Sequence, residues 1–142
     1  MIETALRRKR DAVTTAAEVA NMRGRIEKQH GTDCIWAIKQ VQGGQVDVDF
    51  IAQYLVLAHA CDHSEVVSAD AAEIFEKAAA LNLLDEADAR KLTDAKRLYR
   101  DLQTFLALTI EGEMTDAKVA GFSAPLREDL MEITGCETFE NL

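Results

Sequence analysis

The 142-residue chain is predicted to be mainly all-α, an up-and-down helical bundle, and three observations favour that class. It has a single Pro, so long stretches can form helices without interruption. Aromatic residues make up only 6% of the chain, while alanine and leucine are abundant, a balance that favours helices over strands. Apolar residues also recur every three or four positions over long stretches, as they do along the seam of a helical bundle. The length suits one domain.

Spacing, caps and breakers predict the bounds of the individual helices. One long helix covers residues 85–110, where Asp85 is a suitable N-cap and the apolar stripe includes Leu92, Tyr99 and Phe105. Another long helix is expected from Ile2 to about Gln29. The remaining helices are expected at 50–62, at 69–81 after a Ser68 cap, at 115–121 after a Thr115 cap, and from Pro125 to about Gly135.

One short segment has a different pattern and predicts a short β-hairpin near residues 35–49 as an addition to the bundle. Residues 46–50 alternate apolar and acidic side chains, which is typical of a strand with one buried face. Gly43 and Gly44 separate them from the apolar residues 35–38, and a Gly-Gly pair is a hairpin signal.

Charge and cysteine content exclude several functional classes. The net charge is −9, which argues against a nucleic-acid partner. Residues 1–30 differ from the rest, since they hold seven Lys/Arg and four Asp/Glu, a net charge of +3. No apolar run approaches the length of a membrane span or has the layout of a signal peptide, so no membrane association is expected. Three widely spaced cysteines indicate a reducing cytoplasm rather than a disulfide framework.

The best candidates for chemistry are Asp47 and Asp49. In a strand, residues two apart point to the same side, so these carboxylates would lie together and could bind Mg²⁺. Gly43 and Gly44 would let a phosphate-bearing ligand approach the turn closely. The alternative is that both acids line the solvated face of an amphipathic hairpin. A zinc pair formed by His59 and His63, four residues apart, competes with ordinary polar residues at a helix end.

The segment from Met22 to Leu57 resembles the C-terminal part of the bacterial family of glutamine synthetase adenylyltransferase/adenylyl-removing enzymes. The order and spacing of the motif residues match, although Asp49 stands where the family usually has Glu. These residues are Met22, Arg23, Trp36, Ile38, Lys39, Gly43, Gly44, Asp47, Asp49, Phe50, Gln53, Tyr54 and Leu55.

The resemblance implies a bacterial, cytoplasmic enzyme of nitrogen control that transfers AMP from ATP to a tyrosine of glutamine synthetase and also removes it. It implies Mg²⁺ and ATP as cofactors of the whole enzyme, and a PII-type signal protein as a second candidate partner beside glutamine synthetase. Asp47 and Asp49 would be catalytic metal ligands, and Lys39, Gly43 and Gly44 would face the nucleotide phosphates. Two metal ions would then clamp the attacking and leaving oxygens.

The resemblance also predicts the organisation of the chain. Residues 1–49 would be the end of the adenylylating nucleotidyltransferase domain, and residues 50–142 a C-terminal helical bundle. No Gly-Ser signature followed by Asp-x-Asp is found in the 142 residues. We therefore expect a C-terminal fragment that supports the catalytic domain, is inactive alone and itself needs no cofactor. The alternatives are a non-catalytic helical interaction module and part of a related uridylyltransferase.

Overall fold

The computed structural model describes residues 6, 8–112 and 114–137, and the ordered elements in this part of the chain are helices. The α-helices are α2 (Ala12–His30), α3 (Gln45–His59), α4 (Ala71–Ala80), α5 (Glu86–Thr109), α6 (Asp116–Ala120) and α7 (Ala124–Thr134), with a 3₁₀ turn, η1 (Ser64–Val66). The predicted all-α class is confirmed. Across these described ranges no helix has the length and apolarity needed to cross a bilayer.

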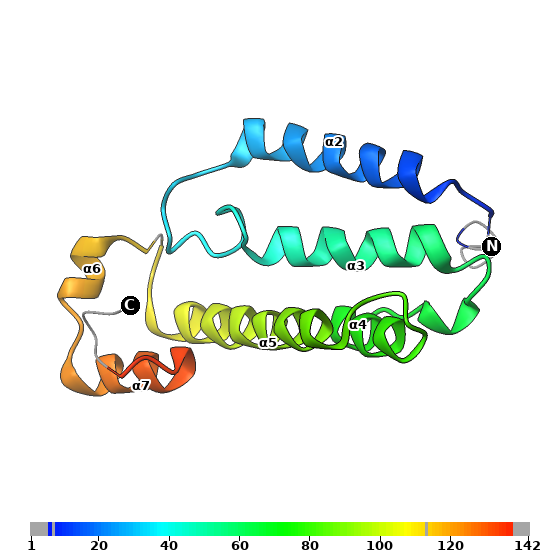
Figure 1. Ribbon diagram of the computed structural model, residues 1–142. Coiled ribbons are helices and arrows are strands. Elements are labelled where there is room, and N and C mark those ends of the chain that lie inside the picture. Colours follow the sequence, from blue (N-terminus) through cyan, green and yellow to red (C-terminus); the bar gives the residue numbers. More distant parts are fainter. Residues whose placement is uncertain (1–5, 7, 113, 138–142) are drawn as a thin grey trace.

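The arrangement is layered, with α3 in the middle (Figure 1). Helix α3 contacts α2 on one side and α4 and α5 on the other, while α7 packs against α5. In this view α6 and α7 lie at the opposite end of the molecule from the start of α2. The loop between α2 and α3 lies near α6, where Trp36 Nε1 donates a hydrogen bond to Asp116 Oδ1 at 2.7 Å.

The core lies where α3, η1 and α4 meet. Phe75 and Val66 are completely buried, and Val48, Ala52 and Leu55 supply the matching stripe of α3. This stripe steps by three and four residues, which is the helical spacing that an apolar face requires. Burial of this apolar surface is the main stabilising contribution in the described part of the bundle.

Several predicted helix boundaries are confirmed by their caps. The Asp85 carboxylate accepts the backbone N–H of Ala87 at 2.9 Å, so α5 begins where the sequence indicates. Thr115 caps α6, and Pro125 lies in the first turn of α7. The cap of α4 is Asp70 rather than Ser68, because the Asp70 carboxylate accepts the Ala72 N–H.

The predicted hairpin at residues 35–49 is wrong. Residues 35–44 form turns, and Gln45–His59 is one helix, so no strand is found in this described segment. Five alternating residues fit either structure, because Val48 also begins the helical stripe that continues to Ala52 and Leu55. The turns accept the first N–H groups of the helix: the Ile38 carbonyl accepts Gln45 N–H at 2.9 Å, and the Lys39 carbonyl accepts Val46 N–H at 3.2 Å.

The predicted continuous helix over residues 2–29 is also wrong. Helix α2 begins at Ala12, and the Asp11 carboxylate caps it by accepting the Thr14 N–H at 2.8 Å. Residues 8–11 are not helical, and residues 1–5 and 7 lie outside the described residues. An aspartate that can cap a helix favours a start at that point over continuation through it.

Candidate functional site

The structure places Asp47 and Asp49 on a helix, which separates the two carboxylates. Residues two apart on an α-helix differ by about 200° around the axis. Asp47 pairs with Arg23 of α2, whereas Asp49 Oδ1 accepts a hydrogen bond from Lys96 Nζ of α5 at 2.6 Å. The expectation that both carboxylates share one face is therefore wrong.

Asp47 joins three segments of the chain. Its carboxylate accepts two hydrogen bonds from the Arg23 guanidinium, one from Nε and one from Nη2 at 3.1 Å. It also accepts the backbone N–H of Gly43 at 2.6 Å. The side chains of Arg23 and Asp47 are only 13% and 24% exposed, so solvent screens this pair weakly.

These contacts set the protonation of Asp47. Burial alone would raise the pKa of its carboxyl, but the hydrogen bonds from Arg23 and Gly43 and the positive charge of Arg23 outweigh burial. The pKa of Asp47 is therefore lowered, and the group is an anion near neutral pH. The pair is a fixed ion pair that ties the start of α3 to α2.

The two glycines are required by backbone geometry. Gly43 has φ of +79°, the left-handed region, and its carbonyl accepts a hydrogen bond from the Tyr99 hydroxyl at 2.6 Å. Gly44 is buried, and a Cβ at that position would lie 2.4 Å from the Ile38 carbonyl oxygen and 2.7 Å from that of Val41. Only glycine fits so close an approach.

We call the set Arg23, Gly43, Asp47 and Tyr99 the polar latch, because it links α2, the turns, α3 and α5. Three of these residues, Arg23, Gly43 and Asp47, belong to the family motif in the sequence. Tyr99 was expected only in the apolar stripe of its helix. Tyr99 and Gly43 are 56 residues apart in the sequence, and a local sequence pattern cannot predict a contact between residues so far apart. Burial, followed by the nearby Asp47 charge, raises the pKa of Tyr99, so its hydroxyl remains a donor at neutral pH.

The residues present do not by themselves fit Mg²⁺. The Asp47 carboxylate is occupied by Arg23 and Gly43, and Asp49 pairs with Lys96. Across residues 8–112 and 114–137 there is no group of three His, Cys, Asp or Glu side chains that could hold a metal ion, which covers His59 and His63 as well.

The backbone N–H groups of Gly43 and Gly44 in the turns are not available to a phosphate. The Gly43 N–H is donated to Asp47, and the Gly44 N–H to the Val41 carbonyl at 2.9 Å. Lys39 is exposed in the same turns. The geometry thus accounts for the motif as a structural junction, and its role toward a nucleotide stays a prediction.

Comparison with known proteins shows which family the chain belongs to. A sequence family described as GlnD PII-uridylyltransferase matches residues 14–138. The chain belongs to this family. The GlnD PII-uridylyltransferase match runs from α2 through α7 and contains every residue of the polar latch.

Within curated proteins, similar relatives carry the name bifunctional glutamine synthetase adenylyltransferase/adenylyl-removing enzyme. The relative from Bradyrhizobium sp. (strain BTAi1) is 43% identical over 110 residues, which cover 78% of this chain and 11% of the relative. The relative from Xanthobacter autotrophicus (strain Py2) is 43% identical over 108 residues, covering 76% and 11%. No solved structure matches the chain. The chain thus spans about a tenth of the length of the relatives it matches, as the resemblance predicted.

Proposed function

We propose that this chain is the helical region of an enzyme that adenylylates and deadenylylates glutamine synthetase, transferring AMP from ATP to a tyrosine. The single observation that carries the proposal is 43% identity over 110 residues to relatives of that name. In this proposal ATP and Mg²⁺ act in the catalytic domain, and the enzyme works in the bacterial cytoplasm. Glutamine synthetase is the substrate, and a PII-type signal protein is a candidate regulator.

The role we propose for the chain itself is support of the catalytic domain. The polar latch favours this role, because the Asp47 carboxylate and Gly43 of the motif make contacts that join helices. The Arg23–Asp47 pair fixes α2 against α3, and the Tyr99 hydroxyl fixes the turns against α5. A rigid junction of this kind holds neighbouring elements in the geometry that catalysis requires.

The alternative reaction is uridylyl transfer to a PII-type protein, and the description of the matching family favours it. A non-catalytic interaction module is the third candidate, and it agrees with the absence of a three-ligand metal group among the described residues. The 43% identity to proteins named adenylyltransferases favours the first proposal over both.

The test replaces the matched 110-residue region of the Bradyrhizobium sp. (strain BTAi1) enzyme with the corresponding part of this chain. We expect the purified chimera to transfer labelled AMP to glutamine synthetase, and the isolated chain with ATP and Mg²⁺ to transfer none. A folded chimera that instead moves UMP to a PII-type protein supports the uridylyltransferase. A folded chimera with neither activity contradicts both enzymatic proposals.

The metal role of Asp47 and Asp49 is tested in the same chimera with a matched pair of variants. Asp47→Asn removes a potential metal ligand and breaks the latch, whereas Arg23→Gln breaks the latch alone. If Asp47 binds metal, Asp47→Asn lowers the rate far more than Arg23→Gln and raises the Mg²⁺ concentration needed for half-maximal activity. Equal losses in the two variants would assign Asp47 to the latch only. Asp49→Asn gives the corresponding test for Asp49.

A further inference from the structure

An open groove lies between the C-terminal parts of α5 and α7, which pack against each other at the α6 end of the molecule (Figure 1). It has a volume of about 360 Å³. Its lining includes Asp101, Phe105 and Leu108 of α5 and Asp129, Glu132 and Ile133 of α7. Successive positions in each set are one to four residues apart, so each helix contributes a single face. We call this surface the α5–α7 groove.

Part of the α5–α7 groove is apolar. Leu108 is 82% exposed, more than any other large apolar side chain in the described ranges. A single exposed leucine is ordinary on a protein surface, but Leu108 lies in one groove with Phe105 and the half-buried Ile133. The groove therefore offers apolar side chains from both helices to a segment that packs between them.

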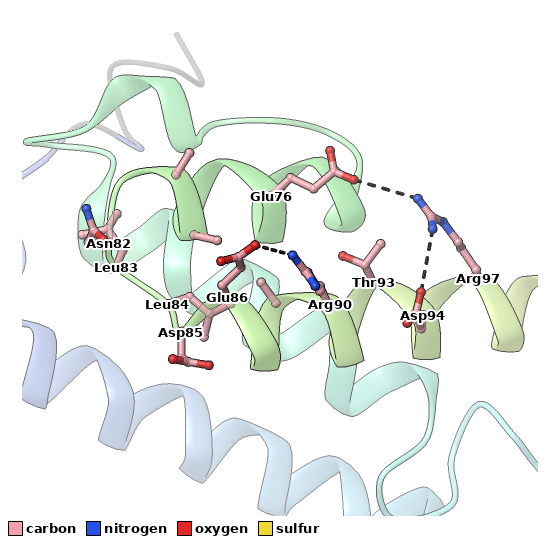
Figure 2. A pocket seen from close by; sticks show the side chains of 13 residues that line it. Glu76, Asn82, Leu83, Leu84, Asp85, Glu86, Arg90, Thr93, Asp94 and Arg97 are labelled. Carbon is pink, nitrogen blue, oxygen red and sulfur yellow. Dashed lines mark hydrogen bonds and ion pairs between the residues drawn. The ribbon is translucent and has the colours of Figure 1, made fainter.

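A larger hollow, of about 950 Å³ between α4 and α5, holds charged side chains that are paired within the chain (Figure 2). Glu86 pairs with Arg90 along α5. Arg97 lies 3.9 Å from Glu76 and 3.7 Å from Asp94. Because these charges already have partners, this hollow gives no indication of what would bind there.

The acidic side chains of the α5–α7 groove differ from those of the larger hollow. Three carboxylates line the groove, and no Lys or Arg does. Asp101 Oδ1 accepts a hydrogen bond from Arg100 Nε at 3.1 Å. In the part of the chain that the structure describes, the exposed carboxylates of Asp129 and Glu132 have no ion pair or hydrogen bond. Their negative charge is therefore available to a positively charged partner.

We propose that the α5–α7 groove binds a basic amphipathic helix of a partner protein. Apolar side chains of that helix pack on Phe105, Leu108 and Ile133, and its Lys and Arg side chains pair with Asp129 and Glu132. The lining residues cover about 10 Å along α5, which is the length of about two turns of a bound helix. Helices that bind in grooves use apolar side chains three, four and seven residues apart, and two turns provide them.

The charge of the groove separates this partner from other occupants. Its carboxylates repel the phosphates of a nucleic acid. A second copy of the chain carries a net charge of −9, so it is repelled as a whole, although its residues 8–10 are all basic. The groove shares no residue with the polar latch, so binding there is a function additional to support of the catalytic domain.

The proposal is tested by titrating the full chain into a labelled synthetic peptide, with fluorescence anisotropy as the readout, at about 0.15 M salt. The peptide has about 20 residues, with Leu at the positions of one helical face and Lys elsewhere. We expect saturable binding at one site. A scrambled peptide of the same composition keeps the charge and lacks the apolar face, so it is expected to bind at least about tenfold more weakly.

Two variants remove the charged and the apolar contacts separately. Asp129→Asn combined with Glu132→Gln removes both unpaired charges and keeps the side-chain shapes, and it is expected to weaken peptide binding about tenfold. Leu108→Ser removes an apolar contact and is also expected to weaken binding about tenfold. The matched control is Asp62→Asn with Glu65→Gln, which changes the net charge equally at exposed positions between α3 and α4, far from α7 (Figure 1). We expect it to change the affinity less than about twofold.

The substituted side chains are all exposed, so the variants are expected to keep the urea midpoint of the wild type. Equal losses of affinity in the Asp129 and Glu132 variant and in the control would show that net charge alone holds the peptide, which overturns the proposal. A wild-type chain that does not bind the peptide also overturns it, as does unchanged affinity in Leu108→Ser. Sedimentation of the wild type adds a further check. Self-association that the Asp129 and Glu132 variant abolishes would assign the groove to residues 8–10 of a second copy and overturn the proposal.

Discussion

On one side α3 packs on its neighbours through Val48, Ala52 and Leu55, each at most 4% exposed, whereas on the other side it meets α2 through the Arg23–Asp47 pair. Helix α2 contributes a single buried residue, Thr15, whose hydroxyl donates to the Asp11 carbonyl of its own helix start. The α4 side therefore depends on apolar burial and the α2 side on directed polar contacts. Apolar burial tolerates small shifts, but a bidentate ion pair fixes position and orientation.

The largest expected effect is on the apolar side. Phe75 is fully buried in the core, so Phe75→Ala leaves a cavity and is expected to lower the free energy of unfolding by about 3–5 kcal/mol. Urea denaturation followed by circular dichroism measures the loss. Leu108→Ala is the control, because Leu108 is 82% exposed, and its effect is expected to stay within about 0.5 kcal/mol. Equal losses in the two variants would contradict the placement of the core.

The second largest effect on stability is expected on the polar side, where α3 meets α2. Asp47→Asn removes the charge that accepts hydrogen bonds from Arg23 and Gly43, and charged hydrogen bonds contribute about 1.5–3 kcal/mol. We expect a loss of that size by urea denaturation. Asp88→Asn is the matched control, since the Asp88–Lys91 pair is exposed and should contribute less than about 1 kcal/mol. A loss no larger than the control would show that the latch does not stabilise the fold.

Asp47→Asn is also expected to change how the stability of the protein depends on pH. Because the pKa of Asp47 is lowered in the fold, its contribution is fully present above the unfolded value of about 3.9. That contribution disappears as the pH falls through the lower folded pKa. The stability difference between wild type and Asp47→Asn should therefore shrink as acid is added below about pH 4. A difference that stays constant through this range would contradict the pKa direction.

The turn between α2 and α3 offers a third comparison, between two glycines. Gly44→Ala forces a Cβ against the Ile38 and Val41 carbonyl oxygens, and overpacking of this kind costs about 1–3 kcal/mol. At Gly24, within α2, an added Cβ meets nothing within 4 Å. Gly24→Ala should therefore stabilise the protein by up to about 1 kcal/mol. Thermal unfolding of the two variants gives shifts of opposite sign, and a shared sign would exclude the close approach at Gly44.

The apolar side of the molecule could be predicted from the sequence. The stripe of α5 and its Asp85 cap are local patterns within one helix. Asp85 caps α5 in the structure, Phe105 is buried, and Leu92 and Tyr99 pack partly buried against the core. The start of α3 could not be predicted in this way. Apolar and acidic side chains alternate over residues 46–50, and this pattern suits both a short strand and the first turns of a helix. Local pattern alone cannot choose between these two structures.

The contacts that hold this segment in the fold come from residues far away in the chain. The Arg23–Asp47 pair joins residues 24 apart, and the Tyr99–Gly43 bond joins residues 56 apart. Spacing rules act within one element and carry no information about such partners. In the structure the motif residues Asp47 and Gly43 make long-range contacts with Arg23 and Tyr99, and their predicted metal and phosphate roles stay predictions.

The smallest expected effect separates the two contacts of Gly43. Tyr99→Phe removes the hydroxyl that donates to the Gly43 carbonyl, at an expected loss of about 0.5–1.5 kcal/mol, because Gly43 is exposed and water can replace the donor. If the latch acts as one unit, the loss in the Tyr99→Phe, Asp47→Asn double variant differs from the sum of the single losses by at least about 0.5 kcal/mol. Additive losses would mean that the two contacts hold the turns independently. An absorbance titration gives a further check, because burial and then the Asp47 charge raise the pKa of Tyr99, and Asp47→Asn should move that pKa back toward its ordinary value.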